Sequence, residues 1–520
     1  MKSFEEIMYD FRDIFITKDA QYKSRNYFAR VKSGQDEDFR TPFWNEAPRD
    51  KILGEWLSHL SDGKLGVPGL LKFEEEMASK VGPLSIMLPL DQRFKDIENY
   101  YDLIKERSSP IHPEAIQNFL RKVKGIHVEP INYDATINKM RLSTNSGVPF
   151  FTRRNKVLYE TRVILYKGMY YIAILGWRGQ EGGPDVEDVK QRVVWMFPLA
   201  VNIRELSVYT PLIEAWQANN INSAYISMRA VEEKITKCFD TKGDNYVIVT
   251  DFSKFDQHFN FDLQNCAEQC LSAMLPSRAG KQWLNDVFSI KYEIPIAIAE
   301  NRMLKGKHGM GSGSGGTNFD ECCAHSCLQE EAALLAGKEL NPYSNAYGDD
   351  GYLTYDGIDV DHIIKCYTSH GQDMNPSKQT VSKDSAVYLR RYFHYNYRDN
   401  KGIMLGIYST ARALGRLMGQ ERYYSHEDEV AYQEYVILRA WSIIENCANH
   451  PMFDEFVDFV IQGDKYKLGL AVPGFMERFE KTFDKLRTLD PDVLGFVKEQ
   501  MHENKGLKDW RIYKYLKSKA

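Results

Sequence analysis

The sequence has no apolar run long enough to cross a lipid bilayer. A spanning helix needs roughly 20 consecutive apolar residues, and no stretch of the 520-residue chain reaches that length. Acidic residues also interrupt the apolar positions of residues 1–15, so this segment lacks the apolar core of a signal peptide. We therefore expect a protein that has no contact with a membrane and is not secreted by the usual route.

The sequence also lacks a large excess of charge of either sign. Its 67 Lys and Arg residues against 72 Asp and Glu residues give a net charge of -5. This balance excludes a protein that coats nucleic acid through a uniformly basic surface. Any path for nucleic acid must therefore be local.

The cysteines lack the spacing of the common metal sites. None of the eight belongs to a C-x-x-C pair with histidine partners, so the pattern indicates neither a zinc site nor a disulfide framework. We interpret them as reduced thiols in a cytosol-like compartment. Internal repeats and low-complexity tracts are absent too, and 43% hydrophobic residues in a chain of this length predict several subdomains with a shared core.

Several segments show the alternation or apolar runs typical of strands. Residues 162–177 and 190–198 predict two strands joined by a Gly-rich, acidic loop. Tyr246–Thr250 predicts a buried strand that ends directly on Asp251, and residues 341–357 predict a β-hairpin with its turn at Gly348–Gly351.

Helical patterns flank these strands. A helix is expected from Pro113 and another, buried, from Thr317. Beyond Asn400 the sequence predicts helices. Ser409 or Thr410 is the expected N-cap of one helix, and residues 427–446 form an amphipathic segment.

Acidic residues stand at two of the predicted strand ends. Asp251 follows one strand, and Asp349 and Asp350 lie in the hairpin turn. Magnesium prefers hard carboxylate oxygens, and two such ions roughly 3.5–4 Å apart catalyse phosphoryl transfer. The alternative is an ordinary hairpin turn, where Asp and Gly are favoured for backbone reasons alone.

The stretch from Gly306 to Asn318 is unusually rich in glycine. Glycines let a backbone approach nucleic acid closely, and Ser312 and Thr317 add hydroxyl groups. A flexible linker is the alternative, but a linker rarely runs straight into a buried helix.

Three motifs share an order and spacing that is known from polymerases. DFSKFD at Asp251–Asp256, SGSGGTN at Ser312–Asn318 and YGDD at Tyr347–Asp350 match polymerase motifs A, B and C. The sequence resembles viral RNA-dependent RNA polymerases. Its motif sequences are most similar to those of the polymerases of picobirnaviruses and partitiviruses, with picobirnaviruses favoured. The resemblance implies that Asp251, Asp349 and Asp350 bind two Mg²⁺ ions, for which Mn²⁺ can substitute.

The same resemblance assigns substrate contacts. Asp256 would accept a hydrogen bond from the ribose 2′-hydroxyl, where reverse transcriptases carry a bulky aromatic residue. Many relatives place an asparagine four residues after the motif B threonine, but this chain has Glu321 there. Whether Asn318 or Glu321 completes ribose recognition is open. The motif B residues expected to contact the substrate are Ser312, Gly313, Thr317 and Asn318.

Other segments resemble the flanking motifs. Lys190 and Arg192 alternate along a strand and so share one face that can meet a triphosphate, as motif F does, although a solvated basic face is the alternative. In motif D, Lys378 would be the general acid that protonates pyrophosphate, and Lys383 is its rival. Motif E, at Tyr388–Tyr392, would place Arg390 against the growing RNA strand.

Ser146–Phe150 resembles motif G at the template entry, with Ser146, Gly147, Arg153 and Arg154 as RNA contacts. An ordinary Gly-Pro turn is the alternative. Residues 505–519 predict a basic amphipathic helix, either a solvated face or a contact for outgoing RNA.

The implied fold is α/β, a closed right hand with an antiparallel catalytic sheet in the palm and a helical thumb. We expect an N-terminal extension that bridges fingers and thumb at 1–85, fingers at 86–245 with part of 262–310, palm at 246–261 and 311–400, and thumb at 401–520.

The implied function is RNA-dependent RNA polymerase. The expected partners are template and nascent RNA, ribonucleoside triphosphates and a viral capsid protein, with the chain as a monomer in the virion interior and in the host cytoplasm during infection. A reverse transcriptase and a non-catalytic, RNA-binding capsid component are the two alternatives.

Overall fold

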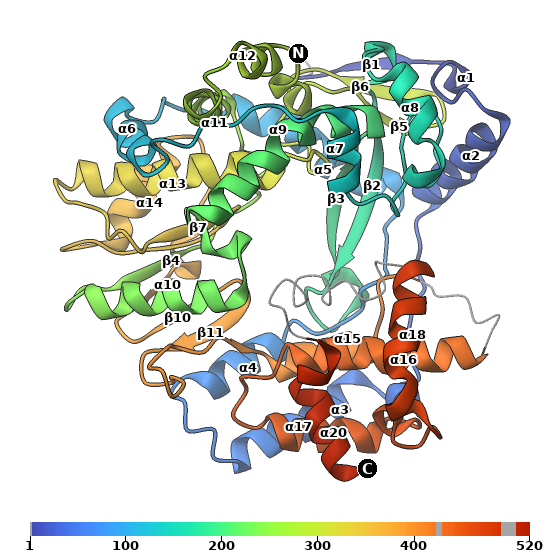
Figure 1. Cartoon of the computed structure of the whole chain (residues 1–520), viewed down its shortest axis with the longest axis vertical. Coiled ribbons are helices and arrows are strands. Elements are labelled where there is room, and N and C mark those ends of the chain that lie inside the picture. Colours follow the sequence, from blue (N-terminus) through green and yellow to red (C-terminus); the bar gives the residue numbers. More distant parts are fainter. Residues whose placement is uncertain (1–2, 423–428, 490–505) are drawn as a thin grey trace. The chain divides into compact units, whose positions relative to one another are not determined.

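The computed structural model describes residues 3–422, 429–489 and 506–520 (Figure 1). The chain forms two compact units, each assembled from three separate segments. Unit 1 comprises Met1–Gly34, Leu88–Trp177 and Arg192–Ala386, and unit 2 comprises Gln35–Met87, Arg178–Gln191 and Val387–Ala520. The bounds of fingers, palm and thumb stay a prediction.

A four-stranded antiparallel sheet lies in unit 1, in the order β7-β8-β4-β9. Its strands are β7 Asn345–Tyr347, β8 Asp350–Leu353, β4 Val247–Thr250 and β9 Thr380–Ser382. The predicted hairpin is confirmed, but its turn is shorter than expected. Tyr347 pairs with Asp350, which leaves a two-residue turn of Gly348 and Asp349. Gly348 has a φ of 63°, and this left-handed conformation is what a tight hairpin turn requires.

One helix forms the centre of the core beneath this sheet. Helix α13 (Thr317–Leu335) is buried along nearly its whole length and packs against three others, as Figure 1 shows. These are α6 Pro113–Lys122, α11 Phe261–Met274 and α14 Val360–Thr368. The helices predicted from Pro113 and Thr317 are both confirmed.

A second, five-stranded sheet has the order β1-β6-β5-β2-β3. Its strands are β1 Glu5–Met8, β6 Arg302–Lys305, β5 Ile296–Ala299, β2 Ala173–Gln180 and β3 Lys190–Met196. The strand expected at 190–198 is confirmed. The remaining helices of unit 1 are α1 Phe11–Ile14, α2 Lys18–Ser33, α5 Phe94–Asp102, α7 Tyr133–Lys139, α8 Leu158–Ile164, α9 Leu199–Ala218, α10 Met228–Thr241 and α12 Arg278–Asp286.

The strand expected at residues 162–177 is wrong over its first half. Helix α8 occupies the start of this range, and only the part from Ala173 is a strand. Ile164 and Leu165 are buried in a cluster with Leu199 and Ile203, whereas Val163 is 62% exposed. Two neighbouring buried residues suit a helix face and not the alternation of a strand, so packing overrides the β-branched composition.

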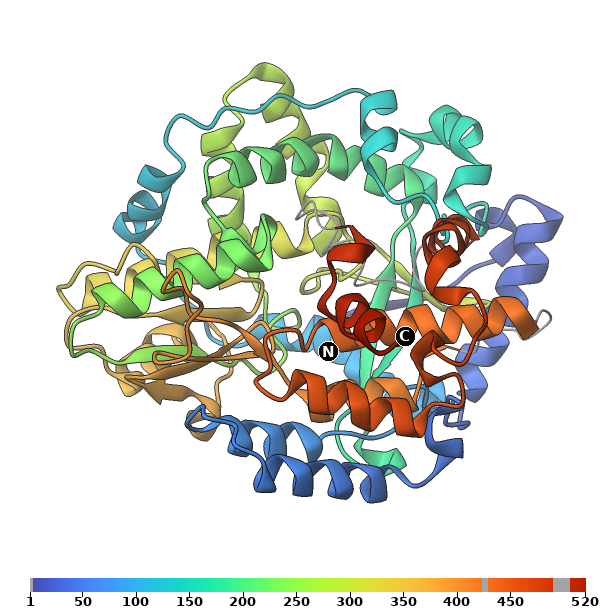
Figure 2. The ribbon, with the colours of Figure 1, turned by 60° about the horizontal axis from the view of Figure 1, so that its bottom comes forward.

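Unit 2 is largely helical, as predicted beyond Asn400. Figure 2 shows α3 and α4, from the N-terminal part of the chain, beside C-terminal helices, and α15 packs against both. Its helices are α3 Arg49–Asp62, α4 Leu70–Ala78, α15 Thr410–Met418, α16 Glu429–Glu445, α17 Phe453–Gly463, α18 Phe475–Leu489 and α20 Arg511–Lys519. A small sheet joins β10 Ser385–Tyr388, β11 Arg391–His394 and β12 Ile407–Tyr408. Two helical segments are predicted here, at residues 427–446 and 505–519. Residues 427, 428 and 505 of these segments lie outside the described residues.

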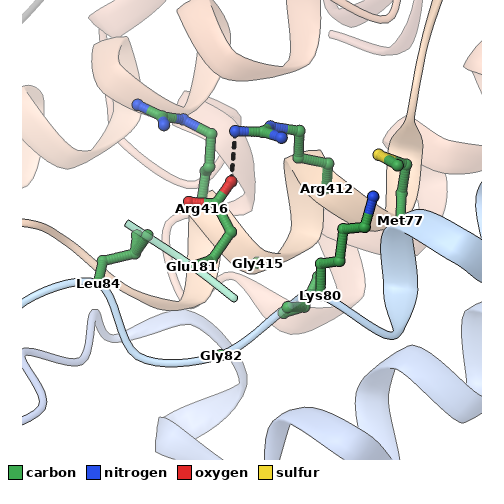
Figure 3. Close-up of a pocket in the computed structure, with 9 residues that line it drawn as sticks. Met77, Lys80, Gly82, Leu84, Glu181, Arg412, Gly415 and Arg416 are labelled. Atoms are coloured by element: carbon green, nitrogen blue, oxygen red, sulfur yellow. Dashed lines mark ion pairs between the residues drawn. The ribbon is translucent and has the colours of Figure 1, made fainter. Parts of the chain in front are cut away.

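Buried polar groups fix the start of α15. Ser409 is its N-cap, as one of the two predicted options. The Glu74 carboxylate accepts hydrogen bonds from Ser409 Oγ at 2.6 Å and from Thr410 N at 2.8 Å. Farther along α15, Arg412 forms an ion pair with Glu181 in the small pocket of Figure 3. None of the polymerase-like motif residues lines that pocket.

Among the described residues, no helix combines the length and apolarity that crossing a membrane requires.

Candidate active site

The register of the four-stranded sheet brings the three predicted aspartates to one end. Thr250 pairs with Gly351 across the antiparallel strands β4 and β8, so the next residue, Asp251, lies beside Asp350. Asp349 occupies the adjoining turn. Asp251 and Asp349 are exposed, and Asp350 is half-buried. Three aspartates from two separate parts of the chain thus lie at one end of the sheet.

The electrostatics of this edge favour bound cations. The pKa of Asp349 is raised, because its surroundings reduce its solvation and because Asp256 and Asp251 repel its charge, while Arg192 partly opposes the shift. Clustered carboxylate oxygens that repel one another are suitable ligands for a hard divalent ion. The donor set therefore fits magnesium or manganese.

The side chain of Gln379 positions Asp251. Its Oε1 accepts from the Asp251 N–H at 2.9 Å, and its Nε2 donates to the Asp251 carbonyl at 2.9 Å. This paired contact places the preceding residue, the exposed Lys378, at the aspartate end of the sheet. The sequence offered no signal for Gln379 beyond its place after motif D.

The rival lysine lies at the opposite end of the sheet. Lys383 Nζ sits 5.3 Å from the ring centroid of Tyr246, the residue that precedes β4. Strand β9 runs antiparallel to β4, with Val247 opposite Ser382. The five residue steps from Tyr246 to Asp251 span about 16 Å in an extended strand, so Lys378 is the nearer of the two lysines to the aspartates.

One face of α13 supports the turn of Gly348 and Asp349. Asn318, Cys322 and His325 are spaced so that they share a helix face. Cys322 Sγ accepts from the Gly348 N–H at 3.3 Å, and His325 Nδ1 lies 2.9 Å from the Gly348 carbonyl. Burial lowers the pKa of His325 to about 4, so the ring is neutral at pH 7. Its Nδ1 must therefore donate to the carbonyl, and Nε2 accepts from Thr250 Oγ1 at 3.4 Å.

The same face bears on the open question of ribose recognition. Glu321 is 5% exposed and hydrogen-bonds Asp256, and its pKa is raised well above the usual value by burial and by Asp256. Asn318 Oδ1 instead accepts from Tyr225 OH at 2.7 Å. Glu321 is thus in direct contact with Asp256 of motif A, whereas the side-chain oxygen of Asn318 is hydrogen-bonded to Tyr225.

The glycine-rich loop is packed against strand β3 and is not a linker. A Cβ on Gly313 would lie 1.6 Å from the carbonyl oxygen of Trp195, so only glycine fits this approach. Ser312 Oγ accepts from Trp195 N at 3.2 Å, and Thr317 Oγ1 donates to the Gly311 carbonyl at 3.2 Å. These groups shape the loop here, and their contact with substrate stays a prediction.

The fold and the sequence both match known proteins. The sequence matches the family described as viral RNA-dependent RNA polymerase over residues 181–402. It is 45% identical over 517 residues to a "Potential RNA-dependent RNA polymerase" of a human picobirnavirus, covering 95% of this chain and 96% of that protein.

The chain belongs to the viral RNA-dependent RNA polymerases. Two crystal structures, of the RNA-dependent RNA polymerase of a human picobirnavirus and of its insertion-loop deletion mutant, superpose with TM-scores of 0.90 and 0.89. Each is 42% identical and covers 98% of this chain and 99% of its own. The right-hand polymerase fold and the nucleotidyltransferase activity expected from the sequence are confirmed, and neither alternative is favoured. Polymerases of this family use divalent metal ions, an RNA template and nucleotides.

Buried charges that the sequence did not reveal anchor motif B of this polymerase. Glu205 on α9 accepts from the Gly315 N–H at 3.2 Å. Asp320 is fully buried and pairs with Lys291 Nζ at 3.0 Å, and Tyr292 OH donates to its carboxylate at 2.6 Å. An acidic residue within a helix sequence does not reveal its partner, so the sequence offered no signal for these contacts.

Basic residues predicted to contact substrate or RNA lie on β3 and after the motif G segment. Lys190 and Arg192 are both exposed on β3, while Val193 is buried, so the shared basic face is confirmed. Arg153 is exposed, whereas Arg154 donates to Asn202 Oδ1 at 2.7 Å.

The motif G segment is a tight turn in this structure. The Ser146 carbonyl accepts from Leu199 N at 2.8 Å, and Gly147 has a φ of 64°. Arg390 is exposed in the turn between β10 and β11. RNA contact by Ser146, Gly147, Arg153, Arg154 and Arg390 stays a prediction.

Proposed function

We propose that this polymerase joins ribonucleotides by a two-metal mechanism in which Asp251 and Asp349 hold two Mg²⁺ ions, with Asp350 beside them. The observation that supports the proposal is the β4–β8 register, in which Asp251 follows Thr250 opposite Gly351, beside Asp350 and next to the turn that holds Asp349. Two ions bound there would activate the attacking 3′-hydroxyl and neutralise charge on the pyrophosphate. Mn²⁺ has the same preference for these ligands.

Positively charged side chains of the chain bind the triphosphate and supply the proton for the leaving group. Arg192 acts on Asp349 electrostatically, which places its charge near the aspartates. Arg192 and Lys190 bind the triphosphate oxygens, and Lys378 protonates the departing pyrophosphate.

Replacing Lys378 by leucine should lower kcat by about 100-fold, the usual contribution of a general acid. The KM for nucleotide should change little, because the proton is needed only in the transition state. Lys383→Leu is the matched control, an exposed lysine of the same segment at the far end of β9. Single-turnover incorporation measures both, and an equal loss in the two variants would reject the assignment of Lys378.

Ribose selection is assigned to Asp256 together with Glu321. Asp256→Ala should reduce the preference for ribonucleotides over deoxyribonucleotides by about 10- to 100-fold, since it removes one hydrogen bond to a charged acceptor. Glu321→Gln keeps a donor toward Asp256 and should retain the preference. Asp361→Ala, at an exposed position in the first turn of α14, should match the parent. Competing incorporation of the two nucleotides checks this, and unchanged selectivity in Asp256→Ala would contradict it.

We further propose the biological setting that its relatives suggest. The polymerase works as a monomer inside the virion, held by capsid protein, where it copies a segmented double-stranded RNA genome, and it is in the host cytoplasm during infection. Its 45% identity to a polymerase of a human picobirnavirus supports this setting. Sedimentation of the purified chain, alone and with capsid protein, tests the monomer and the capsid contact.

The test of the proposed reaction is incorporation of labelled nucleotides on single-stranded RNA, with and without a primer. Ribonucleotide product that needs Mg²⁺ or Mn²⁺ and disappears with a chelator is expected. Product made mainly from deoxyribonucleotides, or product that resists the chelator, would overturn the proposal. The arm without a primer also decides whether the enzyme can start synthesis de novo.

A further inference from the structure

Four cysteines converge between two helices of the buried core. Cys266 and Cys270 lie one turn apart on α11, and Cys323 and Cys327 lie one turn apart on α13. Because residues i and i+4 share a helix face, each helix presents two thiols to the other. All four are at most 1% exposed. The four cysteines belong to two C-x-x-x-C segments and not to C-x-x-C pairs, so the spacing typical of zinc sites gave no signal for them.

The distances suit one ion of a soft metal. The Sγ atoms of Cys270 and Cys327 are 3.8 Å apart, and those of Cys266, Cys270 and Cys327 all lie within 4.8 Å of one another. Zinc–sulfur bonds of about 2.3 Å in a tetrahedron place the sulfurs about 3.8 Å apart. Cys323 is in hydrogen-bond contact with Cys270 but lies outside this mutual group of three, so its sulfur would have to move toward the ion to become the fourth ligand.

The thiols also interact as a group. The thiols of Cys266, Cys323 and Cys327 all contact the sulfur of Cys270, which lies at the centre of the group. Cys238 and Cys447 are buried as deeply, yet neither belongs to a metal-like group among the described residues. Burial of cysteine as a small apolar residue therefore does not by itself explain the convergence.

We propose that Cys266, Cys270, Cys323 and Cys327 form a structural zinc site that ties α11 to α13. Binding of Zn²⁺ forms four zinc–sulfur bonds and releases the thiol protons, with no change of oxidation state. Since the thiols are buried, the ion enters as the chain folds and not through the finished core. Helix α13 carries Glu321 and His325 to the catalytic turn, so the site holds the helix that supports the active site.

Metal analysis of the full-length polymerase, expressed with zinc and dialysed against a chelator under native conditions, tests the proposal. We expect about one tightly held zinc ion per chain, released when the protein is unfolded. Cys270→Ala should lose the metal, whereas Cys238→Ala, an equally buried cysteine on α10, should keep it. Protein expressed with cobalt should show the sulfur-to-cobalt absorption of a tetrahedral thiolate site, which provides a readout if Cys270→Ala does not fold.

Other outcomes would overturn the inference. Wild-type protein that folds without zinc or cobalt and releases eight titratable thiols on unfolding would show a purely apolar cluster. Six thiols would show a disulfide in place of the metal. Equal zinc content in Cys270→Ala and the parent would place the metal elsewhere. None of these readouts depends on nucleotide incorporation, so they are independent of the proposed catalytic mechanism.

Discussion

Asp349→Asn should reduce RNA synthesis by more than about 100-fold, since even residues that only orient metal ligands contribute about 10- to 100-fold. The fold should be unaffected. The pKa of Asp349 is raised in the folded protein, so its ionised form is destabilised by folding, and stability falls as pH rises through that pKa. Removing the charge at neutral pH should therefore leave the melting temperature unchanged or higher.

The control for Asp349→Asn is Asp356→Asn. Asp356 follows β8 closely in the sequence, and its exposed carboxylate forms an ion pair with Lys338 at 2.8 Å. A surface pair of this kind contributes little, so both activity and melting temperature should match the parent. Initial rates of incorporation and thermal unfolding measure the two quantities. Normal synthesis by Asp349→Asn would remove this aspartate from the metal site.

Gly313→Ala should also lower synthesis by about 100-fold or more. The new methyl group would overlap the Trp195 carbonyl oxygen, 1.6 Å away, and neither is a flexible side-chain end. Either the motif B loop or β3 must move by more than an ångström, and displacements of about 1 Å in positioning groups cost on the order of 100-fold. Overpacking should lower the unfolding free energy by about 1–3 kcal/mol.

Gly54→Ala is the matched control. Gly54 lies within α3, and a Cβ there meets nothing within 4 Å. Alanine in a helix interior should stabilise by about 0.5–1 kcal/mol with unchanged synthesis. Chemical denaturation and primer extension on both variants check the pair. A Gly313→Ala enzyme with parental rate and stability would mean that the close approach of the loop to β3 has no importance.

Local patterns along the sequence were enough to determine several features of this protein. An apolar strand that ends on Asp251, a glycine in the hairpin turn and a buried helical pattern after Thr317 are short-range signals, and the structure has all three elements. The order of the three motifs, likewise a property of the sequence, indicated the polymerase family that the comparisons confirm.

Only the tertiary structure decided which distant groups meet. Residues 162–164 became helical because Ile164 packs against Leu199 and Ile203, a contact that β-branched composition does not reveal. The support of Asp251 by Gln379, of the Gly348 turn by His325, and the convergence of four thiols join residues far apart in the sequence. Such contacts depend on strand register and helix packing, which are set by the whole core and not by any local pattern.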